Sequence, residues 1–464
     1  MGAVAVACLG FVAGYPTVIY DSWGYHYLSE ILRTKGLFAW PTDLRTYGYP
    51  AFLVVLSGFR SLPAEELRLI AFVVQLAAHL GACAFVAARL RRIYRSESVG
   101  VWAYAVGALN PALLIHTSEV LSDLLSAVLV QLAVALCWRL PDSNSSRRRL
   151  SPAGSAFLSF LCAGLAVAVR PANAIVALAL LGVWLLRGLL FWRFSLGEVL
   201  AGALGLLLPL VPQLALNWKV FGRINPLIVH SLYRMQTQWG MGALKYGTVV
   251  IPGRSPFLVY ANPFYRGDPT PAAFLRNHPL GYLATLGLHV FAMLDFDYPF
   301  TFITSLDLWY RWPLALVNFA LLAVALAGCG LAVVRLLRRR PIDEAAFAQW
   351  STILVGGAYL AIYAPVEVEN RFGLTPEALM TSLIVAVLVW LFRESPGAPA
   401  RDRARTRSHA LAGAAVIAGI AAGVFLSAWI STKQTNPTQP SPANAFVRDP
   451  ERAPGMARTP SAAQ

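Results

Sequence analysis

Long apolar runs separated by short polar connections make up most of the chain. A membrane-spanning helix needs about 20 mostly apolar residues. Eleven runs come close to or reach that length, at residues 3–20, 67–88, 99–116, 120–138, 155–172, 174–190, 197–216, 312–334, 349–366, 376–392 and 410–430. The pattern predicts an all-α, polytopic transmembrane helical bundle of about 11 spans. The shorter apolar run 51–62 is predicted to be a re-entrant or interfacial piece.

The first apolar run begins the predicted bundle. It has no basic segment in front of it and no A-x-A cleavage site, so we expect a retained span and not a removed signal peptide. The composition agrees with a membrane protein, since 57% of the 464 residues are hydrophobic and 13% are charged. Soluble domains carry about 25% charged residues. A soluble globular enzyme, a disordered chain and a secreted disulfide scaffold are therefore excluded. The five cysteines lie in apolar runs without a C-x-x-C pair, which predicts buried small side chains and no zinc site.

The net charge of +15 comes from arginines in short runs between apolar segments. This placement follows the positive-inside rule of multi-pass membrane proteins and argues against nucleic acid as a partner. With the amino terminus inside, the inner connections are 89–98, 139–154, 187–196, 335–348 and 393–409, which hold 19 of the 38 basic residues. The bias toward Arg and Ala is compatible with a GC-rich bacterial genome. We therefore expect a multi-pass protein of the bacterial cytoplasmic (inner) membrane, with its active site facing the periplasm or exterior.

Three parts of the chain are expected on the outer side. The predicted transmembrane domain covers residues 1–430 and includes a first outer loop at 21–66 and a long outer loop at 217–311. Within the long loop, residues 272–294 are predicted to form an interfacial amphipathic helix or two half-spans. The tail 431–464 is rich in Pro, Ser, Ala and Thr and is predicted to be disordered.

Ionisable residues gather in the predicted outer connections. Such residues are energetically costly near a membrane and therefore mark candidate functional sites. A carboxylate can accept a proton from an acceptor group, and arginines or a lysine can bind a phosphate. These demands fit glycosyl transfer from a polyprenyl-phosphate donor, whose tail stays in the bilayer. The candidates are Asp21, Tyr25, Arg45, Glu119, Arg170, Lys219, Arg223, Glu369 and Arg371.

Six short motifs in these connections, together with their order, resemble the GT-C superfamily of integral membrane glycosyltransferases. The resemblance is greatest to the branch of protein mannosyltransferases and bacterial aminoarabinose transferases, and it covers roughly residues 1–392. The motifs are an acidic residue with an aromatic one after the first span (Asp21, Tyr25), R-x-x-G-Y-P (Arg45 to Pro50), an acidic turn (Thr117 to Glu119), G-L-x-x-x-x-R-P (Gly164 to Pro171), N-x-x-x-F-G (Asn217 to Gly222) and E-x-R-F (Glu369 to Phe372).

The resemblance and the residue chemistry together give each candidate an expected role. Asp21 is the expected general base of an inverting transfer, and Glu119 is a second acid that orients the acceptor or the base. The residues expected to bind the donor phosphate or sugar are Tyr25, Arg45, Arg170, Lys219, Arg223, Glu369 and Arg371. The expected partners are a polyprenyl-phosphate hexose or pentose, a glycan, lipid or protein acceptor, and membrane lipid.

Each candidate also has a purely structural alternative. Asp21 and Glu119 can cap helices, Arg371 can pair with Glu369, and the remaining cations can anchor the chain at the interface. No cofactor is predicted. A divalent metal is compatible but not favoured, because Ser22 stands where many relatives carry a second acid. The isolated D-x-D pattern at Asp295 and Asp297 is too common to indicate a metal site.

A transporter or lipid flippase is the alternative from another functional class, because it also needs charges within the membrane. Transporters often carry internal repeats and broken helices near the bilayer midplane. The sequence has no evident repeat, and its ionisable residues are expected on one face. This distribution favours the glycosyltransferase interpretation.

Overall fold

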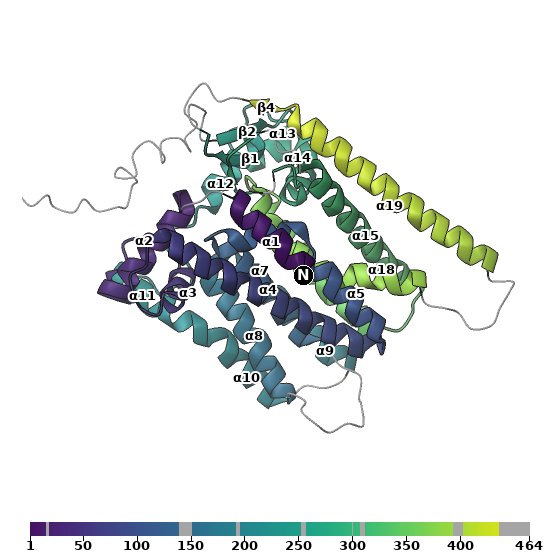
Figure 1. The fold of residues 1–464 in the computed structure, drawn as a ribbon, viewed down its shortest axis with the longest axis horizontal. Helices are drawn as coiled ribbons and strands as arrows, with labels where there is room; N and C mark the ends of the chain where they lie inside the picture. The colour runs from purple at the N-terminus through teal and green to yellow at the C-terminus, as the bar shows by residue number, and fades with distance from the viewer. Residues whose placement is uncertain are drawn as a thin grey trace, which may run out of the picture.

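The fold is a bundle of long apolar helices with a small sheet and short helices along one edge. The computed structural model describes residues 1–14, 18–138, 151–191, 195–251, 257–298, 300–306, 311–392 and 402–435. In Figure 1 the sheet and helices α12 to α14 lie at the upper edge, α2 and α3 lie at the left, and α15 and α19 run toward the lower right. The predicted tail from residue 436 onward and the arginine run at 147–149 lie outside the described residues.

In the described residues, most of each predicted apolar run lies on α-helices. The first eleven α-helices are α1 (Gly2–Ala13), α2 (Tyr20–Lys35), α3 (Gly48–Leu56), α4 (Ala64–Tyr94), α5 (Glu97–Ala108), α6 (Pro111–Ile115), α7 (Ser122–Cys137), α8 (Pro152–Val169), α9 (Ala174–Phe191), α10 (Leu196–Leu207) and α11 (Val211–Phe221). The later ones are α12 (Tyr233–Gly242), α13 (Pro271–Asn277), α14 (Pro279–Leu294), α15 (Arg311–Leu337), α16 (Glu344–Tyr363), α17 (Leu374–Leu379), α18 (Thr381–Phe392) and α19 (Asp402–Ser431). The chain is therefore predominantly helical, as predicted.

The number of candidate spans is lower than the eleven expected. In the described residues seven helices are long and apolar enough to cross a membrane, or up to nine if each bent pair is one span. Helices α1 and α7 are apolar but only 12 and 16 residues long. The first bent pair turns by 53° between α5 and α6, where the side chain of Asn110 caps α6 and Pro111 occupies its first position. An apolar run in the sequence can continue across such a break, so the run is longer than the helix that it predicts.

Helix α7 lies at the centre of the bundle. All but three of its 16 residues are buried, and it packs against α4, α8, α9 and α17. Its Ala and Ser residues allow close helix contacts, as is common in membrane bundles. The side chain of Gln131 adds a polar contact by donating to the carbonyl oxygen of Ala378 at 2.9 Å. The first turn of this central helix carries Ser122 and Asp123 into the candidate site.

Three strands of the long outer loop and one from the tail form a small sheet that the hydrophobic pattern did not predict. Its strand order is β3 (Phe302–Ile303), β1 (Ala243–Val249), β2 (Phe257–Ala261), β4 (Gln434–Thr435). Strand β4 lies in the tail predicted to be disordered from residue 431 onward, so that prediction is wrong for its first residues. Strand β1 pairs antiparallel with β2 and parallel with β3. The segment 272–294, predicted to be an interfacial amphipathic helix or two half-spans, is two helices, α13 and α14, separated at His278.

Two glycines allow the close approaches that bring separate segments to the site. A Cβ atom at Gly48 would overlap the backbone of Ala168, so glycine is required where the R-x-x-G-Y-P segment meets the end of α8. A Cβ atom at Gly373 would overlap the carbonyl oxygen of Met293 in the same way. These contacts bring the R-x-x-G-Y-P segment to the carboxyl end of α8, which Arg170 follows, and bring the Glu369 turn beside α14.

Candidate active site

Asp21 is held between two arginines that come from distant parts of the chain. Its Oδ1 atom accepts a hydrogen bond from Arg45 at 2.5 Å, and its Oδ2 atom accepts one from Arg371 at 2.9 Å. The side chain of Asp21 remains 39% exposed, while that of Arg371 is only 10% exposed. The carboxylate is therefore accessible although both of its oxygen atoms are paired.

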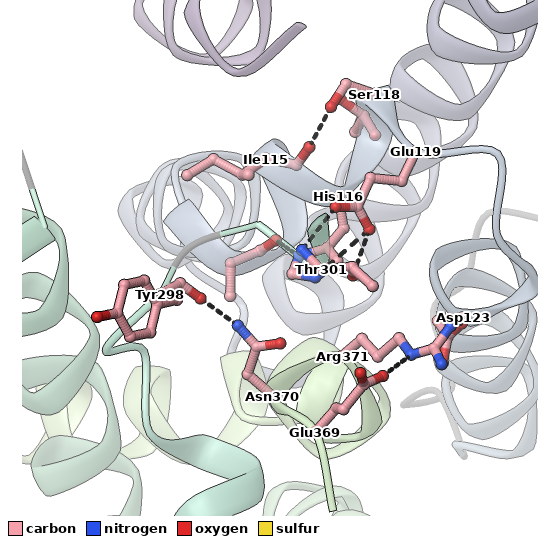
Figure 2. A network of polar contacts seen from close by, with 12 residues as sticks. Ile115, His116, Ser118, Glu119, Asp123, Tyr298, Thr301, Glu369, Asn370 and Arg371 are labelled. Carbon is pink, nitrogen blue, oxygen red and sulfur yellow. Dashed lines mark hydrogen bonds and ion pairs between the residues drawn. The ribbon is translucent and has the colours of Figure 1, made fainter. Parts of the chain in front are cut away.

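The ion pairs continue from Arg371 to two further carboxylates. Arg371 donates through Nε to Glu369 and lies 4.0 Å from Asp123, an arrangement that Figure 2 shows. Asp123 also pairs with Arg170, whose Nε donates to the hydroxyl of Tyr363 at 2.9 Å. We call the connected set of three arginines and three acids the charged cluster; its members are Asp21, Arg45, Asp123, Arg170, Glu369 and Arg371.

The acids of this region have pKa values that are shifted in opposite directions. Burial acts to raise the pKa of Asp21, but the charges of Arg45 and Arg371 outweigh it and hold the pKa well below the usual range. Burial raises the pKa of Glu369 although Arg371 opposes the shift. Burial and the neighbouring charge of Glu369 raise the pKa of Glu367 to about 8. Neighbouring carboxyl groups with separated pKa values are typical of acid–base sites.

The backbone before Asp21 has an unusual conformation. Tyr20 has a φ of 48°, a left-handed value that is uncommon for a bulky residue. Its ring stacks on Phe302 of β3 with the ring centroids 6.2 Å apart. Such local strain occurs most often at functional sites, where the surrounding contacts maintain it. The conformation starts α2 so that Asp21 lies in its first turn.

Tyr25 contacts both Arg45 and the central helix α7. The guanidinium of Arg45 lies 4.5 Å from the ring centroid of Tyr25, which is a cation–π contact. The hydroxyl of Tyr25 is 3.0 Å from the Oγ atom of Ser122 at the start of α7. In the structure, Tyr25 positions Arg45 and joins α2 to the central helix.

Glu119 lies outside the charged cluster and anchors another loop. Its two carboxylate oxygens accept hydrogen bonds from the backbone N–H of Thr301 at 2.8 Å and from the Thr301 hydroxyl at 2.6 Å. Figure 2 shows this pair above the Arg371 contacts, with His116 beside it. Glu119 is buried and its Oε2 atom is 3.8 Å from Nε2 of His116. The geometry is that of a loop anchor; the role of Glu119 as a second acid stays a prediction.

Lys219 and Arg223 lie apart from these ion pairs. Lys219 is exposed on α11, with its ammonium 4.2 Å from the ring centroid of Phe38. Arg223 is exposed just after the left-handed Gly222 that ends α11. Within the described part of the chain, neither side chain pairs with a member of the charged cluster. Donor binding by these two residues stays a prediction.

Sequence reasoning assigned no role to several residues that hold the cluster together. Asp123 joins two of the arginines, and its place beside the predicted acidic turn was the available signal. Strand β1 supports the Glu369 turn: the N–H of Tyr246 donates to the carbonyl oxygen of Val368 at 3.0 Å, and the hydroxyl of Thr248 donates to Glu369 at 3.1 Å. No motif marks β1 in the sequence, so these supports could not be found there.

The D-x-D pattern in the long loop binds a lysine. The ammonium of Lys245 contacts Asp297 and lies 3.4 Å from Asp295. All three side chains are buried. Over the residues that the structure describes, there is no group of three or more His, Cys, Asp or Glu side chains that could hold a metal ion.

Comparisons with known proteins give solved structures of membrane glycosyltransferases. No protein-family model and no curated protein sequence matches the chain. Among solved structures, the chain is similar to the oligosaccharyltransferase AglB from Archaeoglobus fulgidus in complex with an inhibitory peptide and a dolichol-phosphate, at 15% identity and a TM-score of 0.44 over 98% of this chain and 58% of that one. It is also similar to ArnT from Cupriavidus metallidurans bound to undecaprenyl phosphate, at 16% identity and a TM-score of 0.38 over 83% of this chain and 76% of that one.

The chain spans only 58% of the length of AglB. Identities below 20% and TM-scores below 0.5 transfer no residue role to this chain. The functional proposal below therefore rests on the charged cluster itself.

Proposed function

We propose that the protein is a membrane glycosyltransferase that moves a single sugar from a polyprenyl-phosphate donor to a glycan, lipid or protein acceptor. The reaction takes place at the outer face of a bacterial cytoplasmic membrane. The observation that supports this proposal is the accessible carboxylate of Asp21, held between Arg45 and Arg371 beside a bundle of apolar helices. An acid and two guanidinium groups in direct contact can serve a proton acceptor and a phosphate in one place.

The charge balance of the cluster gives the donor a way to activate Asp21. Three arginines and three carboxylates are formally neutral together, so each guanidinium is neutralised before the donor arrives. The donor phosphate competes with Asp21 for Arg45 and Arg371, because arginine binds phosphate oxygens in the same bidentate geometry as a carboxylate. Loss of these contacts raises the pKa of Asp21 toward its ordinary value. The carboxylate then becomes a better base in the presence of the donor than in its absence.

The transfer step follows from these contacts. The acceptor oxygen or nitrogen attacks the anomeric carbon, the bond from that carbon to the phosphate oxygen breaks, and the acceptor proton passes to Asp21. The polyprenyl phosphate leaves with the electron pair of the broken bond, and the arginines stabilise its charge. Attack from the side opposite the phosphate inverts the anomeric configuration. In this proposal Lys219 and Arg223 contact the donor headgroup and not the reacting atoms.

The test compares Asp21→Asn with a matched variant in the same loop. Asp43→Asn is the control, because Asp43 pairs with the exposed His230 at 3.1 Å and, in the described residues, forms no ion pair with the charged cluster. Purified full-length protein is incubated with short polyprenyl-phosphate sugars and candidate acceptors, and lipid products are measured by mass spectrometry. We expect release of bare polyprenyl phosphate by the wild type and by Asp43→Asn, and a loss of at least about 100-fold in Asp21→Asn.

Two results contradict the proposal in different ways. Equal turnover by Asp21→Asn and the wild type removes the assigned base but leaves the transferase activity. Movement of the intact lipid-linked sugar across a vesicle membrane, with no chemical change in any donor, replaces the transferase by the flippase alternative.

A further inference from the structure

Asn217 begins the N-x-x-x-F-G segment and has no role in the transfer step proposed above. Its side chain, on α11, is 1% exposed, and so is that of Gln213, four residues before it. The Nε2 atom of Gln213 donates to Oδ1 of Asn217 at 2.9 Å. Such a pair on one helix face contributes little to helix stability by itself. Both amides also make hydrogen bonds outside the helix, and these bonds point to another role.

We propose that Gln213 and Asn217 are positioning residues that hold Arg45 at its place against Asp21. They act through the backbone around Arg45 and contact neither the donor nor the acceptor. The inference rests on the proposed function, because it concerns an arginine that is proposed to bind the donor phosphate. It gives the N-x-x-x-F-G segment a role that the charged cluster alone does not show.

The backbone around Arg45 is held at two places. The carbonyl oxygen of Arg45 accepts a hydrogen bond from Nε1 of Trp40 at 3.1 Å. Two residues later the backbone N–H of Tyr47 donates to Oε1 of Gln213 at 3.1 Å. The hydroxyl of Tyr47 also donates to the carbonyl oxygen of Pro209, just before α11, at 2.6 Å. The segment that carries Arg45 is therefore fastened to the start of α11.

Asn217 sets the orientation of the Gln213 amide. The Nδ2 atom of Asn217 donates to the carbonyl oxygens of Asn225 and Leu227 at 2.6 and 2.5 Å, so its Oδ1 atom accepts from Gln213. Gln213 then turns Nε2 toward Asn217 and Oε1 toward the N–H of Tyr47. A buried amide network in which each group has its partner fixes the backbone that it binds.

Helix α11 also supports the helix that carries Asp21. Leu216 lies between the two amides in the sequence and packs with Leu28 of α2 and with Trp40 in one buried apolar cluster. Figure 1 shows α2, α3 and α11 together at the left of the molecule. One helix thus supports both members of the ion pair between Asp21 and Arg45.

The position of Arg45 matters because its contacts are close. Its Nη2 atom is 2.5 Å from Asp21, and its guanidinium lies 4.5 Å from the ring centroid of Tyr25. A displacement of the backbone at Tyr47 would move the guanidinium away from Asp21 and from the donor phosphate. Misplacement of a reacting or binding group by about 1 Å can lower a rate by about 100-fold.

The test is a double-variant cycle. It measures the Kd of one short, bare polyprenyl phosphate for the full-length protein in lipid nanodiscs by native mass spectrometry. Gln213→Met removes both hydrogen bonds of the amide and keeps the length of the side chain. We expect it to weaken binding about tenfold, and by less than about twofold when Arg45→Met is already present. A residue that acts through Arg45 has no further effect once Arg45 is removed.

A milder variant and a control complete the cycle. Tyr47→Phe removes only the hydrogen bond to Pro209, and we expect it to weaken binding about threefold, again only while Arg45 is present. Gln349→Met is the matched control, because Gln349 on α16 is equally buried and donates to the hydroxyl of Tyr94 at 3.2 Å. This control should bind the lipid as the wild type does in both backgrounds.

The outcomes separate the inference from the proposed function. Equal fold losses with and without Arg45 show a general structural role and overturn the inference alone, as does full binding by Gln213→Met. If Gln213→Met does not fold, the Tyr47→Phe cycle decides in the same way. Sugar transfer by the same variants should follow the binding pattern. A wild type that neither binds the bare lipid nor releases it from any donor removes the proposed function together with the inference.

Discussion

Replacement of Arg371 tests whether its positive charge stabilises the fold by neutralising the carboxylates around it. Arg371 contacts three carboxylates, those of Asp21, Glu369 and Asp123. In Arg371→Met, Asp21 keeps Arg45 and Asp123 keeps Arg170, so both retain a cation. Among the described residues, Glu369, whose side chain is 3% exposed, keeps a hydrogen bond from the Thr248 hydroxyl but no cation. The loss of stability in Arg371→Met therefore comes mainly from the buried Glu369 carboxylate, which no longer has a cation beside it.

The size of the effect follows from that residual charge. Removal of one partner from a buried ion pair typically costs about 3–5 kcal/mol, because the other charge stays buried and unpaired. We expect Arg371→Met to cost about 3 kcal/mol, since Thr248 still satisfies part of the carboxylate. Glu369→Gln in the same chain removes the orphaned charge. The double variant Arg371→Met, Glu369→Gln should therefore recover most of the lost stability without recovering sugar transfer.

The assay is thermal unfolding of the purified variants in one detergent, followed by intrinsic fluorescence. A control variant, Arg335→Met, removes an exposed ion pair, in which Arg335 in the last turn of α15 lies 2.9 Å from Asp343. Exposed pairs contribute about 0–1 kcal/mol, so this control should hardly move the midpoint. If the two cluster substitutions lower the midpoint additively, Glu369 does not depend on Arg371 and the reasoning is refuted.

Three further predictions concern other groups. The pKa of the Glu367 carboxyl is about 8 in the folded protein and near 4.5 in an unfolded chain. Between these values the folded protein keeps a proton that the unfolded chain releases. The free energy of unfolding should therefore fall as the pH rises from about 5 to 8. Glu367→Gln should flatten that fall in thermal unfolding measured across this pH range. If Glu119 only anchors Thr301, Glu119→Gln and Thr301→Val should each lower the free energy of unfolding by about 1–3 kcal/mol and reduce the transfer rate by equal fractions. A loss of transfer in Glu119→Gln alone would show a chemical role. Arg89 donates to three carbonyl oxygens at the end of α7, so Arg89→Ala should lower the unfolding midpoint and Arg89→Lys should lower it less.

The helical bundle was predictable because membrane-spanning helices must bury their backbone groups and must be long and apolar. The convergence of Asp21, Arg45, Arg170 and Arg371 was predictable for a related reason. Charged side chains in so apolar a chain need partners, and the predicted topology places these segments on one side. The partners themselves were not predictable, since spacing along the chain does not say which acid meets which arginine. Asp123 shows this, because it links two arginines but was not among the predicted site residues.

The long outer loop shows where sequence reasoning stops. Its D-x-D pattern offered two acids, and two acids suit a metal ion or an ammonium equally well. The choice depends on Lys245, which lies 50 residues earlier on a strand that no periodicity indicates. Strand β1 becomes recognisable only through its partners, which include β2, β3 and the backbone of Val368. The same strand supports Glu369 through Thr248. The residues that support the Glu369 turn are thus defined by tertiary pairing, and local sequence carries no sign of them.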